Sequence, residues 1–150
     1  MHIFNKQAVA HRLALSSLKT VYADASTIGS GPVVTSVVAK ASSGATITYG
    51  SGTEGGGLAL RSKYGFEICY KDCQGGLASN GANGPFFSAN ITASTATTVT
   101  IVGPEHLGGA VVMVRYGFDD MPSLFYGTQI AVYNKEGLPA TPGAFNVTKA

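Results

Sequence analysis

Few side chains of this sequence could carry out chemistry, and most of them stand alone. The three histidines are scattered, and the two cysteines are Cys69 and Cys73. A structural zinc site normally combines two pairs of Cys or His residues at ligand spacing, and no second pair accompanies the cysteines. We therefore expect neither a metal site nor a cofactor.

The cysteine pair suits a disulfide only if the chain turns between its members. Four residues of extended strand would hold the two Cα atoms about 13 Å apart, whereas a disulfide needs about 7 Å or less. Lys71 and Asp72 could supply the turn. The spacing thus predicts a small staple across a hairpin or bulge, with two buried free thiols as the alternative.

Two glycine-rich segments imitate catalytic or nucleotide-binding motifs. Residues 50–55 (Gly-Ser-Gly-Thr-Glu-Gly) follow a strand pattern and fit the dinucleotide fingerprint, but that fingerprint needs a helix directly after it and an acidic residue about 20 positions later. Residues 79–81 (Ser-Asn-Gly) resemble half of a nucleophile elbow, with Leu77 where the first glycine should stand. We interpret both segments as loops.

The aromatic residues offer one further kind of site, a platform on which sugar rings could stack. The chain has seven Phe, seven Tyr and no Trp. Phe66, Tyr116 and Phe118 alternate along predicted strands and are expected in the core. Phe86–Phe87 and Phe125–Tyr126 fall in predicted loops and are the better candidates for a sugar surface.

The element at the start of the chain is a helix predicted over residues 7–22. Its apolar side chains cover an arc of roughly 240° at about 100° per residue, which is too wide for a helix that packs on one sheet. Such a helix normally lies in an α/β layer between a sheet and a neighbouring element. No parallel sheet is predicted here, so the helix is expected to be left over from a layer that this sequence does not encode.

After Gly31 the pattern changes to short β-branched and aromatic runs separated by Gly, Pro, Ser and Asn. Their spacing is too short for βαβ crossovers and is typical of an antiparallel sheet. We predict a mainly β fold, an antiparallel β-sandwich or jelly roll preceded by the one helix. The predicted strands are 33–39, 45–49, 58–61, 64–70, 87–93, 97–102, 110–118 and 129–133.

Charge and composition exclude two classes of partner and suggest an exported protein. The net charge is +2 with only 12% charged residues and no Lys/Arg run, so we expect neither nucleic-acid nor membrane binding. The first residues lack the charged and apolar regions of a signal peptide. Asn90 and Asn146 begin Asn-x-Thr glycosylation acceptors, and the surface rich in Thr, Ser and Gly suits an extracellular β protein.

The end of the chain contains Val-Arg-Tyr-Gly-Phe at residues 114–118, then Asp120 and Pro122, and then Tyr-Asn-Lys-Glu-Gly-Leu-Pro-Ala-Thr-Pro at residues 133–142. This series resembles the C-terminal end of sialate O-acetylesterases. Those proteins close with a similar Val-Arg-Tyr-Ala-Trp stretch, then an Asp and a Pro, and then a Leu-Tyr-Asn and a Gly-Leu-Pro-Ala segment. Further segments of the chain agree in the same order, so the resemblance runs essentially from end to end. The matching segments are 5–7, 12–15, 30–33, 65–68, 114–118 and 133–142.

This resemblance implies a serine esterase of the SGNH type with a catalytic Ser-His-Asp set. The family histidine lies three residues before an Asn or Asp, and His2 stands three before Asn5, so His2 falls on the general-base position. Ile3 replaces the usual proline. The nucleophile block and the oxyanion-hole residues would lie before Met1. The implied domains are residues 1–24, a remnant of the hydrolase domain, and residues 25–150, the β domain. Secretion or a lysosomal location is implied as well.

Two functions follow as hypotheses. In the first, the chain is the C-terminal fragment of an esterase that removes O-acetyl groups from sialic acids or other acetylated glycans, and it is inactive by itself because acyl transfer needs the missing nucleophile. In the second, it is a standalone β-sandwich that binds carbohydrate or has a structural role.

Overall fold

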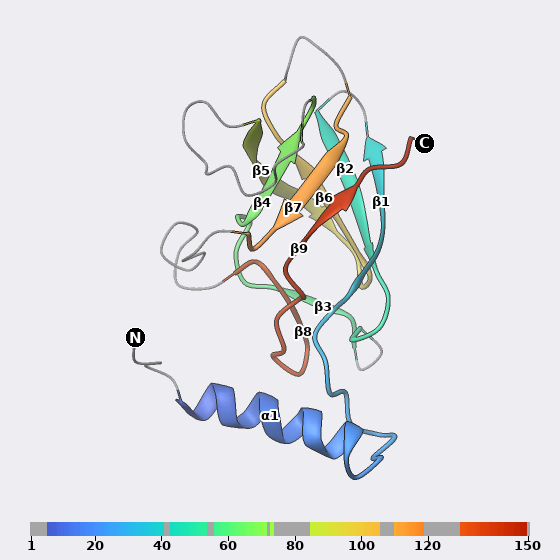
Figure 1. The fold of residues 1–150 in the computed structure, drawn as a ribbon, viewed down its shortest axis with the longest axis vertical. Helices are drawn as coiled ribbons and strands as arrows, with labels where there is room; N and C mark the ends of the chain where they lie inside the picture. Colours follow the sequence, from blue (N-terminus) through green and yellow to red (C-terminus); the bar gives the residue numbers. More distant parts are fainter. Residues whose placement is uncertain are drawn as a thin grey trace.

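The computed structural model is mainly β, with one helix at its N-terminal end (Figure 1). It describes residues 6–40, 43–53, 56–71, 73, 85–105, 110–118 and 130–149. The helix α1 covers Lys6–Thr20. The strands are β1 (Val34–Lys40), β2 (Gly44–Tyr49), β3 (Leu58–Leu60), β4 (Phe66–Cys69), β5 (Phe86–Ser94), β6 (Thr98–Val102), β7 (Met113–Tyr116), β8 (Val132–Asn134) and β9 (Gly143–Asn146).

Seven of these strands form one antiparallel sheet that curls into a nearly closed barrel. Their order is β1-β2-β6-β5-β4-β7-β9. The two edges meet just after β9, where the Thr148 amide donates to the Val37 carbonyl of β1 and the Thr148 carbonyl accepts from the Ala39 amide. Closure of this kind removes exposed sheet edges. The remaining strands, β3 and β8, form a small sheet at the end of the barrel that faces α1 (Figure 1).

The barrel encloses the hydrophobic core because its strands alternate between inward and outward residues. Ile47, Phe66 and Ile101 point into the interior and are fully buried. The Phe66 and Tyr116 rings lie 4.5 Å apart between their centroids, within the range of favourable aromatic contacts. The core also contains Val37, Ala45, Tyr49, Ile68, Tyr70, Ala89, Val99, Val114, Ala131 and Val132.

All eight predicted strands are present, and each end lies within three residues of its predicted position. The prediction of a mainly β, antiparallel fold with one N-terminal helix is therefore confirmed. The structure adds a ninth strand, β9, which pairs with β7. Its sequence, Gly-Ala-Phe-Asn, contains one large apolar residue and follows a proline, so it lacks the run of β-branched residues by which strands are predicted.

Candidate functional site

The residue predicted to be catalytic, His2, lies outside the described residues. The described chain begins at Lys6, four positions later, where α1 also begins. No group of three metal-ligating side chains occurs among the residues that the structure describes. In the same part of the chain, no helix is both long and apolar enough to cross a membrane. In the sequence, helix α1 directly follows the histidine segment, so the description of the site starts from α1 and its attachment to the barrel.

Helix α1 presents its apolar residues to solvent. Leu13 is 64% exposed, and Val21 and Tyr22, directly after the helix, are each 74% exposed. None of the residues of α1 is buried. Each large aliphatic side chain left exposed forgoes about 1.5–3 kcal/mol of burial. The face that the sequence predicts to be buried in an α/β layer is thus open for a partner.

The end of α1 is fixed by a compact turn around Asp24. Ala23 adopts a left-handed backbone conformation with φ of 54°, and the Asp24 amide donates to the Leu18 carbonyl. The Asp24 carboxylate accepts hydrogen bonds from the Ser26 amide and hydroxyl and from the Thr27 hydroxyl. These bonds, with the Ser26 side chain first, lower the pKa of Asp24 from 3.8 to about 2. The chain leaves the helix in a defined direction.

The segment that follows then folds back along the last turn of the helix. The Lys19 ammonium donates to the Ala25 carbonyl at 3.2 Å. A Cβ atom at Gly29 would lie 2.6 Å from the Lys19 Cβ, so the absence of a side chain there allows the close approach. An open groove of about 400 Å³ lies between the helix end and the barrel, lined by Ser16, Lys19, Thr20, Ala25, Thr27, Ile28, Gly29, Ser30, Ser51 and Gly52.

The buried side chain of Asn134, the last residue of β8, ties this segment to the barrel. Its amide nitrogen donates to the Ser30 carbonyl at 3.2 Å and to the Gly52 carbonyl at 3.0 Å. Its amide oxygen accepts from the Leu138 amide at 2.8 Å. One side chain therefore joins the linker after α1, the loop between β2 and β3, and the turn after β8.

A second polar cluster lies in the barrel wall, where β4 pairs with β7. Glu67 and Arg115 face each other across the two strands, and the Arg115 Nε donates to the Glu67 carboxylate at 2.5 Å. Both side chains are buried. The Arg115 guanidinium also lies 3.9 Å from the centroid of the Phe86 ring, a cation–π arrangement. Because Glu67 and Arg115 are buried and paired with each other, we interpret this ion pair as a structural feature of the barrel wall and not as a catalytic acid or base.

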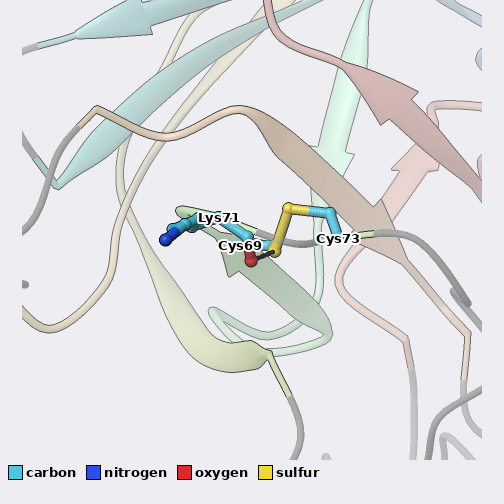
Figure 2. Close-up of a disulfide and its surroundings, with 3 residues drawn as sticks. All are labelled: Cys69, Lys71 and Cys73. Carbon is cyan, nitrogen blue, oxygen red and sulfur yellow. Dashed lines mark hydrogen bonds between the residues drawn. A yellow bond between two sulfur atoms is a disulfide. The ribbon is translucent and has the colours of Figure 1, made fainter.

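The structure joins Cys69 and Cys73 by a disulfide, with their Cα atoms 6.0 Å apart (Figure 2). The Cys69 sulfur lies 3.3 Å from the Lys71 carbonyl oxygen. Because a disulfide sulfur carries no hydrogen, this is a close contact and reflects the tight turn that the four-residue spacing requires. The bridge packs against Phe86 and Met113 in a small cluster of its own.

The predicted sugar surface at Phe86–Phe87 is wrong. Phe86 begins β5 and is only 6% exposed, because it is covered by the disulfide and by Arg115. Phe87 is half-buried against the main core, 5.9 Å from the Tyr70 ring. The sequence around them resembles a loop because Gly and Asn precede the strand. Phe125–Tyr126, the second candidate pair, lies outside the described residues.

Both acceptor asparagines are on the barrel surface. Asn90 lies in β5 and Asn146 ends β9, and both side chains are exposed. Neither position places the asparagine against the core. Glycosylation at Asn90 and Asn146 stays a prediction.

Segments that are distant in the sequence and that carried the family resemblance meet in pairs. Residues 30–33 contact residues 133–142 through Asn134 and through the Thr141 amide, which donates to the Pro32 carbonyl at 3.0 Å. Residues 65–68 pair with residues 114–116 through the Glu67–Arg115 ion pair. The segments that resemble the family thus include both sides of two contacts within the fold. Sequence reasoning missed Asn134 as a site residue, although it stands inside one of these segments.

Comparison with known proteins agrees with the resemblance to sialate O-acetylesterases. The family model of the sialate O-acetylesterase C-terminal domain matches residues 34–147. A carbohydrate acetylesterase from Xanthomonas citri has a similar structure, with a TM-score of 0.68 and 25% sequence identity over 95% of this chain. The chain spans 28% of the length of that protein. No curated protein sequence matches. Because the family model covers the barrel from β1 through β9, this chain belongs to the sialate O-acetylesterase C-terminal domain family.

Proposed function

We propose that the chain acts as the C-terminal part of a serine carbohydrate acetylesterase, which hydrolyses O-acetyl esters on sialic acids or other acetylated glycans. In this proposal His2 is the general base, and a preceding hydrolase segment supplies the serine nucleophile and the oxyanion hole. The chain by itself has no esterase activity. The β barrel carries the helix and the histidine segment and is not the place where the ester is cleaved.

The observation that best supports this proposal is the unburied apolar face of α1 beside a complete barrel. A barrel with its own closed sheet and core needs no helix, yet the helix carries large apolar side chains exposed to solvent. Such a face suits the surface of an α/β layer. The match to the C-terminal domain family also supports the proposal, and so does the fact that this chain spans only 28% of the Xanthomonas citri esterase.

The chemistry assigned to His2 is proton transfer. A neutral imidazole accepts the proton of the serine hydroxyl as the oxygen attacks the acetyl carbonyl carbon, and it then donates that proton to the departing sugar oxygen. A water molecule then attacks the acetyl-enzyme. His2 accepts the proton of the water and donates it to the serine oxygen as acetate is released. An imidazole placed before a helix fixed to a rigid barrel is suited to this role because proton transfer depends on geometry.

The proposal is tested in a chimera. The matching part of the Xanthomonas citri carbohydrate acetylesterase is replaced by this chain, and acetate release from an aryl acetate and from an acetylated sialoside is measured. We expect an active chimera in which His2→Ala lowers kcat by about 10⁴-fold or more. His11→Ala is the matched control, because His11 is an exposed histidine on α1. The chain alone should release no acetate.

Three results would contradict the proposal. A His2→Ala chimera as active as its parent would remove the general-base assignment. Acetate release by the chain alone, abolished by His2→Ala, would show that it contains a complete site. Saturable binding of an acetylated sialoside by the chain, together with a folded but inactive chimera, would favour the carbohydrate-binding module.

A further inference from the structure

Three hydrogen bonds of one buried side chain, Asn134, attach the linker after α1 to the barrel. Asn134 is 1% exposed. Its side chain has two N–H donors and one carbonyl acceptor, and the structure supplies a partner for both ends of the amide. A carboxylate could not replace it, since two of the partners are carbonyl oxygens that need donors.

Two glycines bring the backbones close enough for these bonds. A Cβ atom on Gly31 would lie 1.8 Å from the Pro139 carbonyl oxygen, and one on Gly52 would lie 2.2 Å from the Gly31 carbonyl oxygen. Gly52 also has φ of 86°, a conformation that favours glycine. We call Asn134, Gly31, Gly52 and Pro139 the Asn134 clamp. Any side chain at position 31 would force the linker away from the barrel.

Asn134 ends β8, which belongs to the small sheet at the end of the barrel that faces α1 (Figure 1). On one side, the linker continues from Gly31 toward β1, and just before that strand the Val33 amide donates to the Ser51 carbonyl at 3.0 Å. On the other side, Gly29 packs against Lys19 of α1. Only Ser30 separates the glycine held by the helix from the glycine held by the barrel. An orientation set at the clamp is therefore transmitted to the helix.

We propose that Asn134 and Gly31 are positioning residues that hold α1 in one orientation on the barrel, and with it the histidine segment that precedes the helix. The link to catalysis rests on the proposed function, whereas the link to the helix does not. A merely structural role for these residues would stabilise the barrel. A positioning role changes the orientation of α1 and the rate of the chemical step while the barrel stays folded.

The first test uses the chain alone and measures residual dipolar couplings of backbone amides by NMR. In the parent, the couplings of α1 and of β2 and β6 should fit one common alignment tensor. Gly31→Ala and Asn134→Ala should shrink the α1 couplings at least twofold and leave the β2 and β6 couplings in place. Asn90→Ala is the matched control, because Asn90 is exposed on β5.

Couplings of α1 that stay on the common tensor in Gly31→Ala would overturn the proposal. So would loss of the folded barrel in Gly31→Ala, because the glycine would then be a folding residue.

The second test introduces the same substitutions into the acetylesterase chimera. We expect kcat to fall about 10- to 100-fold with KM changed less than twofold, since a displacement of about 1 Å can cost about 10²-fold in rate. Unchanged kcat in a variant whose helix is uncoupled would overturn the positioning role. If the parent chimera is folded but inactive, the proposed function fails, and uncoupling of α1 in the first test still supports the clamp.

Discussion

Helix α1 and the barrel are built from similar apolar residues, yet only the barrel buries them. In the barrel, Phe66, Ile47 and Ile101 are fully buried within one closed sheet. In and after α1, Leu13, Val21 and Tyr22 are mostly exposed. Burial of apolar surface stabilises either segment by the same free energy per unit area. The two segments therefore differ in whether another surface covers their apolar side chains. The barrel buries its apolar side chains within its own sheet, whereas no residue of α1 is buried.

The comparison is sharpest for two large-to-small substitutions. Phe66→Ala should lower the free energy of unfolding by about 3–5 kcal/mol, because it leaves a cavity beside Tyr116 in a packed core. Leu13→Ala should change it by less than about 0.5 kcal/mol, as for other surface substitutions. Urea unfolding followed by tyrosine fluorescence gives both values.

The opposite outcome for the helix would be informative. If Leu13→Ala destabilises the chain by as much as Phe66→Ala, α1 is buried in solution, and unfolding at two protein concentrations tests whether a second copy covers it. An unfolding midpoint that rises with concentration would show such association. The comparison between an open helix and a closed barrel would then be wrong.

The strands were predictable from the sequence because most of them carry a local pattern of β-branched and aromatic residues. Their alternation along predicted strands placed Phe66 and Tyr116 in the core, and both are there. The missed strand β9 has a weak pattern and forms because β7 offers it an edge. Barrel closure through Thr148 was also not predictable, since it depends on contacts between the two ends of the β region.

The site was less predictable for a physical reason. A buried asparagine such as Asn134 shows no periodic signal, and its role comes from carbonyl groups at Ser30 and Gly52, which every residue possesses. Only the family resemblance of its segment could have pointed to it. Phe86 was misplaced because the glycine-rich sequence before it indicated a loop, whereas Arg115 and the disulfide cover its ring.

Two buried tyrosines test how completely the barrel satisfies its own polar groups. Among the described residues, the Tyr49 hydroxyl has no hydrogen-bond partner, whereas the Tyr116 hydroxyl accepts from the Val132 amide at 2.8 Å. Burial raises the pKa of both phenols above the ordinary value. Tyr116→Phe should lower the free energy of unfolding by about 1–3 kcal/mol, since it leaves a buried N–H unpaired.

Tyr49→Phe is the matched variant and should be neutral or stabilising. It removes a hydroxyl that is buried without a partner and keeps the ring in place. Thermal unfolding of both variants beside the parent measures the difference. A larger loss from Tyr49→Phe than from Tyr116→Phe would mean that the Tyr49 hydroxyl has a partner in solution, and that the interior of the barrel is more polar than the structure indicates.

The smallest expected effect concerns the turn that ends α1, and it tests whether the open helix is nevertheless well anchored. The hydrogen bonds from Ser26 and Thr27 lower the pKa of Asp24 to about 2. Because the folded pKa lies below the ordinary value of 3.8, the contribution of Asp24 to the turn is fully present above pH 3.8 and is lost as the pH falls through about 2. The carboxyl carbon shift of Asp24 in NMR should therefore have its midpoint near pH 2. Ser26→Ala removes the largest cause and should move this midpoint toward 3.8. A parent midpoint already near 3.8 would show that the turn is open in solution, and the helix would then lack the anchor from which the Asn134 clamp could orient it.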